Sequence, residues 1–80
     1  MKIKKNIALS DSGFVFDPAS GNSFTTNPIG LEIIQLLKQE KSEKEIEKEI
    51  MTNYNIDSET FERDFSDFIS VLTKMRLTEG

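Results

Sequence analysis

The side chains that most often carry out catalysis are missing from this 80-residue chain, which has no cysteine and no histidine. The sequence therefore offers no thiolate nucleophile, no imidazole base, no disulfide and no zinc site of the usual ligand types. Carboxylates, lysines and hydroxyls are present, but no pair of them stands at a spacing that indicates an acid–base site. We therefore predict a chain that is not an enzyme and that holds neither a metal ion nor a cofactor.

The charge pattern argues against two further classes of protein. The net charge is -4 at pH 7, whereas nucleic-acid affinity rests largely on clustered lysine and arginine. The cations that gather, Lys2, Lys4 and Lys5, are followed by an apolar run too short for a signal peptide, and no later run is long enough to span a membrane. We expect a soluble cytoplasmic protein. Its partners are expected to include neither a membrane nor a nucleic acid.

The first third of the chain predicts strands separated by turns. Residues 3–9 favour a first strand with the odd-numbered residues on one face. Turn-forming residues at 10–13 and 17–22 enclose a second strand at 14–16, and a third strand follows at 23–26. Two successive hairpins give an antiparallel three-stranded meander.

The helices that follow have clear start signals. Asn27 is a favoured N-cap, and Pro28 fits the first helical position because it needs no hydrogen-bond partner. Ser42 and Glu45 match a capping box, which begins a second helix that runs to about Asn53. The sequence thus predicts one α+β domain over residues 1–80, with a three-stranded antiparallel sheet followed by three helices.

The first helix is expected to be buried on more than one side. Apolar residues occupy a main face and also lie outside it: Ile29, Ile33, Leu36 and Leu37 on the face, with Leu31 and Ile34 beyond it. Gly30 lies inside this helix, where glycine costs about 1 kcal/mol relative to alanine. Its presence indicates either close packing against another backbone or a flexible first turn.

The third helix, predicted over residues 58–75 with Asp57 or Ser58 as its cap, has the strongest apolar pattern in the chain. Six apolar residues fall within a stripe of roughly 120° on its surface: Phe61, Phe65, Phe68, Ile69, Leu72 and Met75. This stripe is expected to close the core, and one of its margins could also border a groove. Residues 76–80 are too few to add a large element, and we expect Leu77 to fold back onto the core.

In order and detail the chain resembles the PqqD-like family of peptide chaperones, also called RiPP recognition elements. The resemblance covers about residues 7–77. It rests on four features: the hairpins, Thr26-Asn27 leading into Gly30 and the run Ile33-Ile34-Gln35-Leu36-Leu37, the capped helix from Ser42 to the aromatic Tyr54, and the third-helix set Asp64, Phe65, Phe68 and Leu72 with the terminal Leu77. The chain departs from the family at Pro28 and Ile29 and lacks its Asp-Gly after the first helix.

The resemblance implies a winged helix-turn-helix-like domain that binds the leader segment of a ribosomally made precursor peptide. In such domains the leader adds as a strand to the edge of the third strand, in a groove beside the third helix. The domain then presents the peptide to a modifying enzyme, often a radical-SAM protein, in natural-product or cofactor biosynthesis. The domain itself performs no chemistry.

The candidate peptide-binding residues follow from this geometry. On the strand they are Ser23, Phe24, Thr25 and Thr26, an edge without proline or charge that is open to pairing, or simply too short to be a hazard. On the third helix they are Asp64, Phe68, Val71 and Met75, at one margin of the stripe. The sequence leaves open whether this margin faces the strand or the opposite one does, which carries Glu62, Ile69, Thr73 and Arg76. Val71 and Met75 could equally be peripheral core, and Arg63, Asp67 and Lys74 could pair with leader charges or be solvated surface.

Two alternatives come from other functional classes. A winged-helix DNA-binding or regulatory module would use the same fold, but the outer face of the third helix mixes acidic Glu62 and Asp67 with Arg63 and Lys74. A small dimerising domain would instead pair its strand edge with a second copy. A monomer or a weak homodimer is consistent with the sequence.

Overall fold

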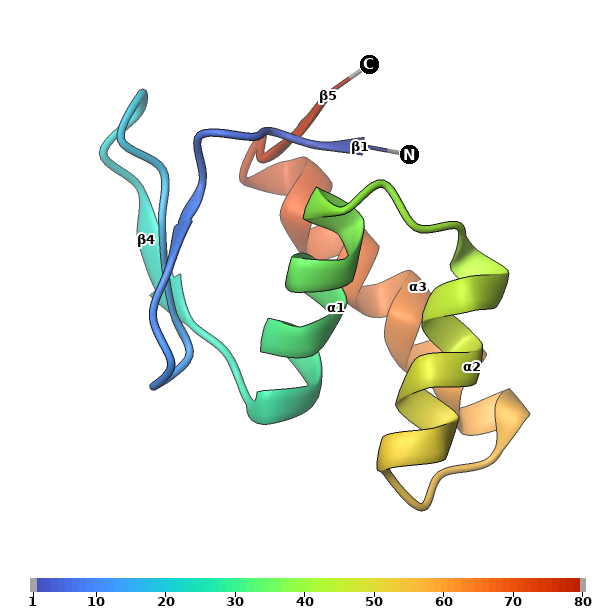
Figure 1. The fold of residues 1–80 in the computed structure, drawn as a ribbon. Helices are drawn as coiled ribbons and strands as arrows, with labels where there is room; N and C mark the ends of the chain where they lie inside the picture. Colours follow the sequence, from blue (N-terminus) through green and yellow to red (C-terminus); the bar gives the residue numbers. More distant parts are fainter. Residues whose placement is uncertain (1, 80) are drawn as a thin grey trace.

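The computed structural model describes residues 2–79, with the sheet on one side and three helices on the other (Figure 1). The elements in chain order are β1 (Lys2–Ile3), β2 (Ala8–Leu9), β3 (Phe14–Phe16), β4 (Ser23–Thr25), α1 (Pro28–Lys38), α2 (Glu43–Asn53), α3 (Ser58–Lys74) and β5 (Thr78–Glu79). The strands β2, β3 and β4 form an antiparallel sheet in that order, so β2 and β4 are its edges. The predicted α+β order of a three-stranded meander and three helices is confirmed.

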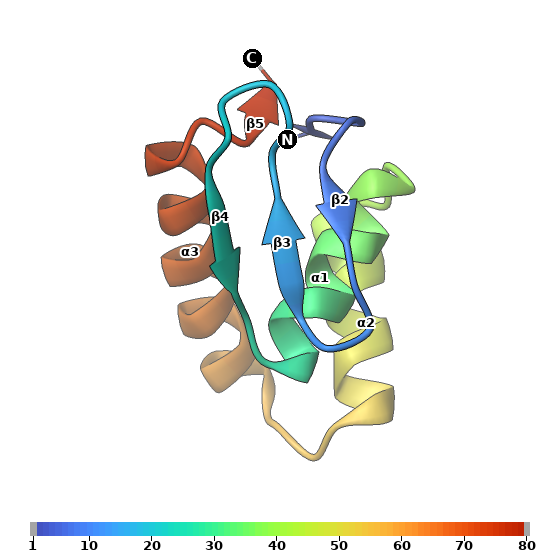
Figure 2. The same cartoon turned by 90° about the vertical axis from the view of Figure 1, so that its left-hand side faces the viewer.

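The sheet turns one face to the helices and the other outward (Figure 2). Val15 of the central strand is buried and lies opposite both Leu9 and Phe24 in the ladder. Its neighbour Phe14 is 43% exposed, because successive side chains of a strand point to opposite faces. The tight turn before β3 needs the positive φ of Gly13.

The predicted first strand over residues 3–9 is wrong as a single element. The chain turns at Lys5 and Asn6, so β1 leaves the meander and pairs with β5 near the C-terminus. The turn keeps both Ile3 and Ile7 in the core, where they are at most 2% exposed. Burial of these two isoleucines therefore matches the alternation in the sequence, while strand continuity does not.

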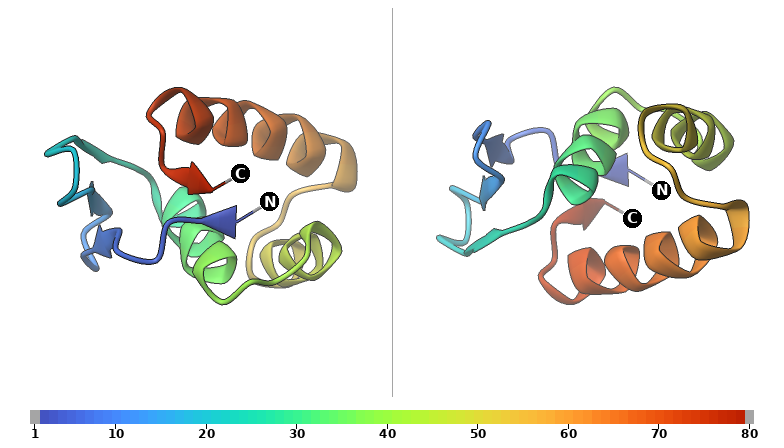
Figure 3. Two further views of the ribbon diagram at one scale, coloured as in Figure 1. Left: turned by 90° about the horizontal axis from the view of Figure 1, so that it is seen from above. Right: turned by 90° about the horizontal axis from the view of Figure 1, so that it is seen from below.

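The C-terminal residues contribute more than was predicted. Leu77 is 1% exposed, which confirms that it folds back onto the core. The amide of Lys4 donates to the carbonyl of Leu77 at 2.8 Å, which brings β1 beside β5. Figure 3 shows the two short strands side by side and α1 lying between the three-stranded sheet and α2. The predicted tail includes Gly80, which lies outside the described residues.

The helix caps appear where the sequence placed them. Asn27 accepts a hydrogen bond from the Gly30 amide at 2.8 Å, and Ser42 and Glu45 form both bonds of the capping box. Asp57 caps α3, which ends at Lys74 with Met75 as its C-cap, one residue earlier than predicted.

The core forms where the apolar faces of the three helices meet the inner face of the sheet. In α1 the residues Leu31, Ile33, Ile34, Leu36 and Leu37 are all buried, which confirms burial on more than one side. In α3 the stripe is buried along its centre at Phe61, Phe65 and Leu72. The rings of Phe61 and Phe65 stack with their centroids 5.3 Å apart. Within residues 2–79 no helix is long and apolar enough to cross a membrane.

Candidate functional site

The free edge of β4 carries backbone groups that no other segment within residues 2–79 satisfies. In an antiparallel ladder, residues alternate between those that bond the neighbouring strand and those that point away from it. The Asp17 amide donates to the Asn22 carbonyl and the Thr26 amide donates to the Gly13 carbonyl, both at 2.8 Å. This alternation directs the N–H and C=O groups of Ser23 and Thr25 away from β3, toward the open edge.

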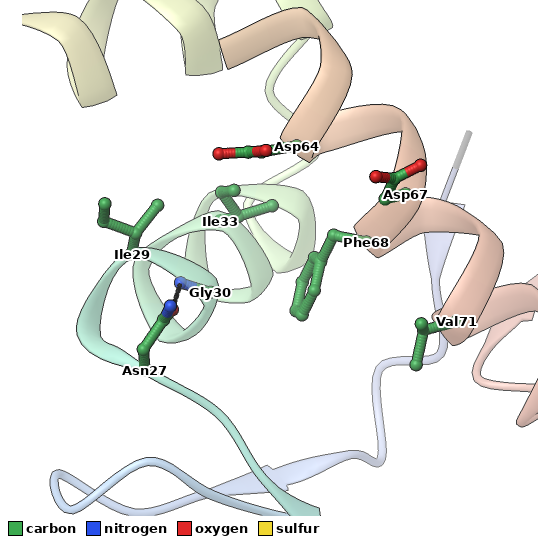
Figure 4. Close-up of a pocket in the computed structure, with 8 residues that line it drawn as sticks. All are labelled: Asn27, Ile29, Gly30, Ile33, Asp64, Asp67, Phe68 and Val71. Atoms are coloured by element: carbon green, nitrogen blue, oxygen red, sulfur yellow. Dashed lines mark hydrogen bonds between the residues drawn. The ribbon is translucent and has the colours of Figure 1, made fainter. Parts of the chain in front are cut away.

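An apolar recess lies near this edge, between the start of α1 and one margin of α3 (Figure 4). Its volume is about 330 Å³. The residues that line it are Asn27, Ile29, Gly30, Ile33, Asp64, Asp67, Phe68 and Val71. We call it the α1–α3 pocket. Ile33 is buried, whereas Val71 is 45% exposed and stands at the mouth on α3.

Gly30 allows the two walls of the α1–α3 pocket to approach each other. A Cβ atom at this position would collide with the Thr26 hydroxyl and would lie 3.2 Å from Cε1 of the Phe68 ring. The sequence left two explanations for this glycine, close packing or a flexible first turn, and the contacts favour close packing. Gly30 permits close packing, but against side chains rather than against another backbone, which corrects the expectation.

The structure decides which margin of α3 faces the sheet. β4 is the strand that runs beside α3, while β2 lies on the opposite side of the sheet (Figure 2). Asp64, Phe68 and Val71 line the α1–α3 pocket, next to the end of β4. The opposite margin, with Glu62 and Ile69, instead lines a shallow recess shared with Glu43 of α2.

The structure brings together some of the predicted site residues and separates others. Asp64, Phe68 and Val71 share one pocket, whereas Met75 is half-buried against the core and is absent from its lining. Thr26 lies just after β4, where its amide bonds Gly13 and its hydroxyl faces Gly30. Ser23 and Thr25 carry the open edge, and Phe24 turns its half-buried side chain inward.

Sequence reasoning missed the contribution of α1 to the pocket. One wall is made by the N-cap and the first two turns of α1, at Asn27, Ile29, Gly30 and Ile33. Asn27 is a helix cap, Ile33 is a core residue and Ile29 is a half-buried apolar residue. Such residue types have ordinary structural roles and gave no functional signal. Gly30 was the one usable sign, because a glycine inside a helix requires a reason.

The rim of the α1–α3 pocket is acidic. Asp64 and Asp67 are exposed and lie on the pocket side of α3, above Ile33 and Phe68 (Figure 4). Arg63 partly balances the charge of Asp64, because its Nε lies 3.7 Å from an Asp64 carboxylate oxygen. Among residues 2–79, no lysine or arginine forms an ion pair with Asp67. The rim therefore keeps a net negative charge.

A buried carboxylate holds the turn that leads into β4. Asp17 is 1% exposed, and burial alone would raise its pKa. Hydrogen bonds from the Ser20 hydroxyl and the Ala19 amide, together with the charge of Lys4, lower that pKa below its usual value. The carboxylate therefore stays ionised and fixes the β3–β4 turn.

The other edge of the sheet is partly closed by the protein itself. The Lys38 ammonium donates to the carbonyl of Ile7, just before β2, at 2.6 Å. The amide of the same Ile7 donates to the carbonyl of Lys4. Two of the backbone groups at this edge are therefore already satisfied.

Comparison with known proteins agrees with this arrangement. The fold and the pocket of this chain define a class of small α+β domain, in which the open edge of a three-stranded sheet lies near an apolar recess. The chain matches the family described as "Coenzyme PQQ synthesis protein D (PqqD)" over residues 13–77, and it belongs to the PqqD family. The resemblance seen in the sequence is thereby confirmed.

A solved structure supports the same assignment. The chain is similar to "TbiB1 in Complex with the TbiA(beta) Leader Peptide", with a TM-score of 0.86 and 32% sequence identity. The likeness covers 100% of this chain and 96% of that chain. The search of curated proteins gave no match.

Proposed function

We propose that this protein is a non-catalytic peptide chaperone that binds the leader segment of a ribosomally synthesised precursor peptide. The leader would add as a strand to the free edge of β4 and place a side chain in the α1–α3 pocket. The observation that carries the proposal is the pairing of an unsatisfied strand edge with an apolar recess at its end. Strand addition draws affinity from such backbone groups and specificity from neighbouring pockets.

Membership of the PqqD family and the similarity to a leader-peptide complex support this role. The residues at the site suit binding better than catalysis, because Ser23 and Thr25 offer backbone groups and the pocket offers apolar surface. Within residues 2–79, no group of three or more acidic side chains is placed to hold a metal ion. The bound leader would be delivered to a modifying enzyme, for which a radical-SAM protein is the partner class that the family resemblance implies.

Titration of the isotope-labelled chain tests the proposal. The probe is the leader segment of a candidate precursor peptide, sought among short open reading frames beside the gene for this chain. We expect its addition to shift the amide signals of Ser23 and Thr25 and of the α3 margin at Phe68 and Val71. The signals of Ala8, at the other edge, serve as the internal control. A leader that binds and leaves both β4 and this margin unshifted would show that the groove assignment is wrong.

Delivery is tested separately. A candidate radical-SAM enzyme, sought among neighbouring genes, is mixed with the leader-bound chain, and modification of the full precursor is followed by mass spectrometry. We expect modification to depend on the chain. An enzyme that modifies the precursor equally well without the chain would contradict the delivery role while leaving peptide binding intact.

A further inference from the structure

The α1–α3 pocket combines an apolar interior with a negative rim, and this combination narrows the chemistry of the peptide it accepts. Ile29, Ile33, Phe68 and Val71 supply the apolar walls. A volume of about 330 Å³ exceeds what one leucine-sized or aromatic side chain needs. Apart from the two aspartates of the rim, Asn27 is the polar side chain among the lining residues, and its oxygen already accepts from the Gly30 amide.

The rim adds charge at a defined distance from that interior. Asp64 and Phe68 are four residues apart on α3, and Asp67 and Val71 have the same spacing, so each carboxylate lies one helical turn from an apolar wall residue. One turn of helix rises about 5.4 Å. This rise is less than the roughly 6.4–6.8 Å between alternate residues of an extended peptide. A cation one or two residues from an anchored side chain can therefore reach the rim.

The charges around the pocket favour a cation over an anion. Helix α1 begins here, and its N-terminus carries about half a positive charge. Asp64 and Asp67 contribute two full negative charges, of which Arg63 offsets part of the first. Asp67 has no ion-pair partner within residues 2–79. The balance at the rim is negative, and Asp67 is the group open to a new partner.

We propose that the pocket selects a peptide segment in which an apolar anchor residue lies one or two positions from a lysine or arginine. The anchor fills the space between Ile33, Phe68 and Val71, and the basic side chain pairs with Asp67, assisted by Asp64. The basic residue lies on the α3 side of the anchor, where Asp64 and Asp67 form the rim. This inference rests on the proposed function and specifies the peptide that the same site takes.

Selection from a library of random twelve-residue peptides, displayed on phage and captured by the full chain, tests the proposal. We expect the enriched peptides to share an apolar residue with lysine or arginine one or two positions away. The same selection is repeated on the double variant Asp64→Asn, Asp67→Asn. Its enriched peptides should keep the apolar residue and lose the basic one.

A matched control removes the same charge elsewhere on α3. Glu59→Gln with Glu62→Gln has the same three-residue spacing and the same change in net charge, but these residues lie outside the pocket. Selection on this control should still enrich lysine and arginine. Loss of the basic preference in the control as well would mean general attraction to an acidic protein, and it would overturn the assignment to Asp67.

A double-mutant cycle then isolates the ion pair. One enriched peptide is synthesised with its basic residue intact or changed to glutamine, and each form is titrated into the wild-type chain and into Asp67→Asn. Either change alone should weaken binding about twofold to fivefold, the range for a partly exposed pair. The two changes together should weaken binding little more than either change alone. Additive effects would overturn the pairing.

The possible outcomes distinguish a failure of this inference from a failure of the proposed leader-binding function. Peptides that shift the amides of Ser23 and Thr25 but show no basic preference would leave strand addition standing and reject the rim pairing. Peptides that bind without shifting those amides would contradict the proposed function itself. A selection that enriches nothing would contradict both.

Discussion

The two edges of the three-stranded sheet differ in what lies next to them. The β2 edge begins at Ile7, whose carbonyl accepts from Lys38 and whose amide donates to Lys4. In the part of the chain that the structure describes, the β4 edge has no such partners at Ser23 and Thr25, and it ends beside the α1–α3 pocket. Open strand edges invite pairing with other chains, and proteins usually block them. The protein therefore satisfies part of the β2 edge at Ile7, whereas the β4 edge stands open beside a pocket and offers a place for a peptide strand.

The largest expected effect comes from removing a backbone donor at the open edge. In Thr25→Pro the lost amide is one that points away from β3, so the ladder within the protein keeps its bonds. We expect leader affinity to fall at least tenfold, or about 1.4 kcal/mol, measured by calorimetry.

Thr25→Val is the matched control for that change, because it keeps the amide and alters the side chain. It should bind within about twofold of the wild type, a difference of roughly 0.4 kcal/mol. Equal loss in both variants would mean that the side chain at this position, and not the strand edge, recognises the peptide.

A charge at the mouth of the pocket should have the next largest effect. Val71 is 45% exposed, so Val71→Glu should change the free energy of unfolding by less than about 1 kcal/mol. It should weaken leader binding about fivefold, since an apolar anchor would meet a charged group.

Met51→Glu is the counterpart on α2, where the wild-type side chain is similarly exposed at 38%. Fluorescence anisotropy should show wild-type affinity for this variant. If both variants lose affinity equally, exposed apolar surface in general, and not the α1–α3 pocket, governs binding.

Removing the side chain that partly closes the β2 edge should lower stability and leave binding unchanged. Lys38→Met removes the ammonium that bonds the Ile7 carbonyl while keeping the apolar stem. We expect the free energy of unfolding to fall by about 1 kcal/mol in urea denaturation. Leader affinity should stay at the wild-type value. A gain of leader-induced amide shifts at Leu9 would show that this bond had been protecting β2 from pairing.

The smallest expected effect is that of acid on the hairpin that carries β4. The folded-state pKa of Asp17 lies below its ordinary value of 3.8. Its contribution is therefore fully present above the unfolded pKa and disappears as the pH falls through the lower folded value. Thermal unfolding of the wild type should show this loss below about pH 4.

Asp17→Asn supplies the control for acid sensitivity. Its unfolding curve should lose the part of the pH dependence that belongs to this carboxylate, while the part due to the helix caps at Glu45 and Asp57 persists. The β2–β3 turn, held by the Ser10 hydroxyl, contains no carboxylate among its hydrogen bonds. The hydrogen bonds of this turn should therefore persist at a pH at which the bonds of Ala19 and Ser20 to Asp17 weaken.

Local rules predicted most of the elements. The caps at Asn27 and Ser42, the bounds of α2 and the buried centre of α3 depend on neighbouring residues and on helical periodicity, and each appears in the structure. The continuous first strand was wrong, because the pairing of β1 with β5 joins residues more than seventy positions apart. Alternation within one segment carries no information about such a distant partner.

The candidate site could be predicted only in part, because spacing within one segment does not show which distant segment it faces. Phe68 and Val71 could be assigned to a margin of α3 from their spacing alone, but either margin could have faced the sheet. Met75 illustrates the limit, since its half-buried side chain packs on the core instead of lining the pocket. A position near the end of a stripe leaves both placements open until the neighbouring elements are in place.

The sequence by itself determined the helix caps, the apolar stripe and the absence of cysteine and histidine, because these are properties of residue types and of short-range spacing. It also determined that β4 would lack proline and charge. Only the tertiary structure decided that β4 lies beside α3, that Lys38 bonds the Ile7 carbonyl at the other edge, and that Gly30 lets Phe68 approach α1. These depend on contacts between segments distant in the chain, which form when the helices and the sheet bury their apolar faces against one another.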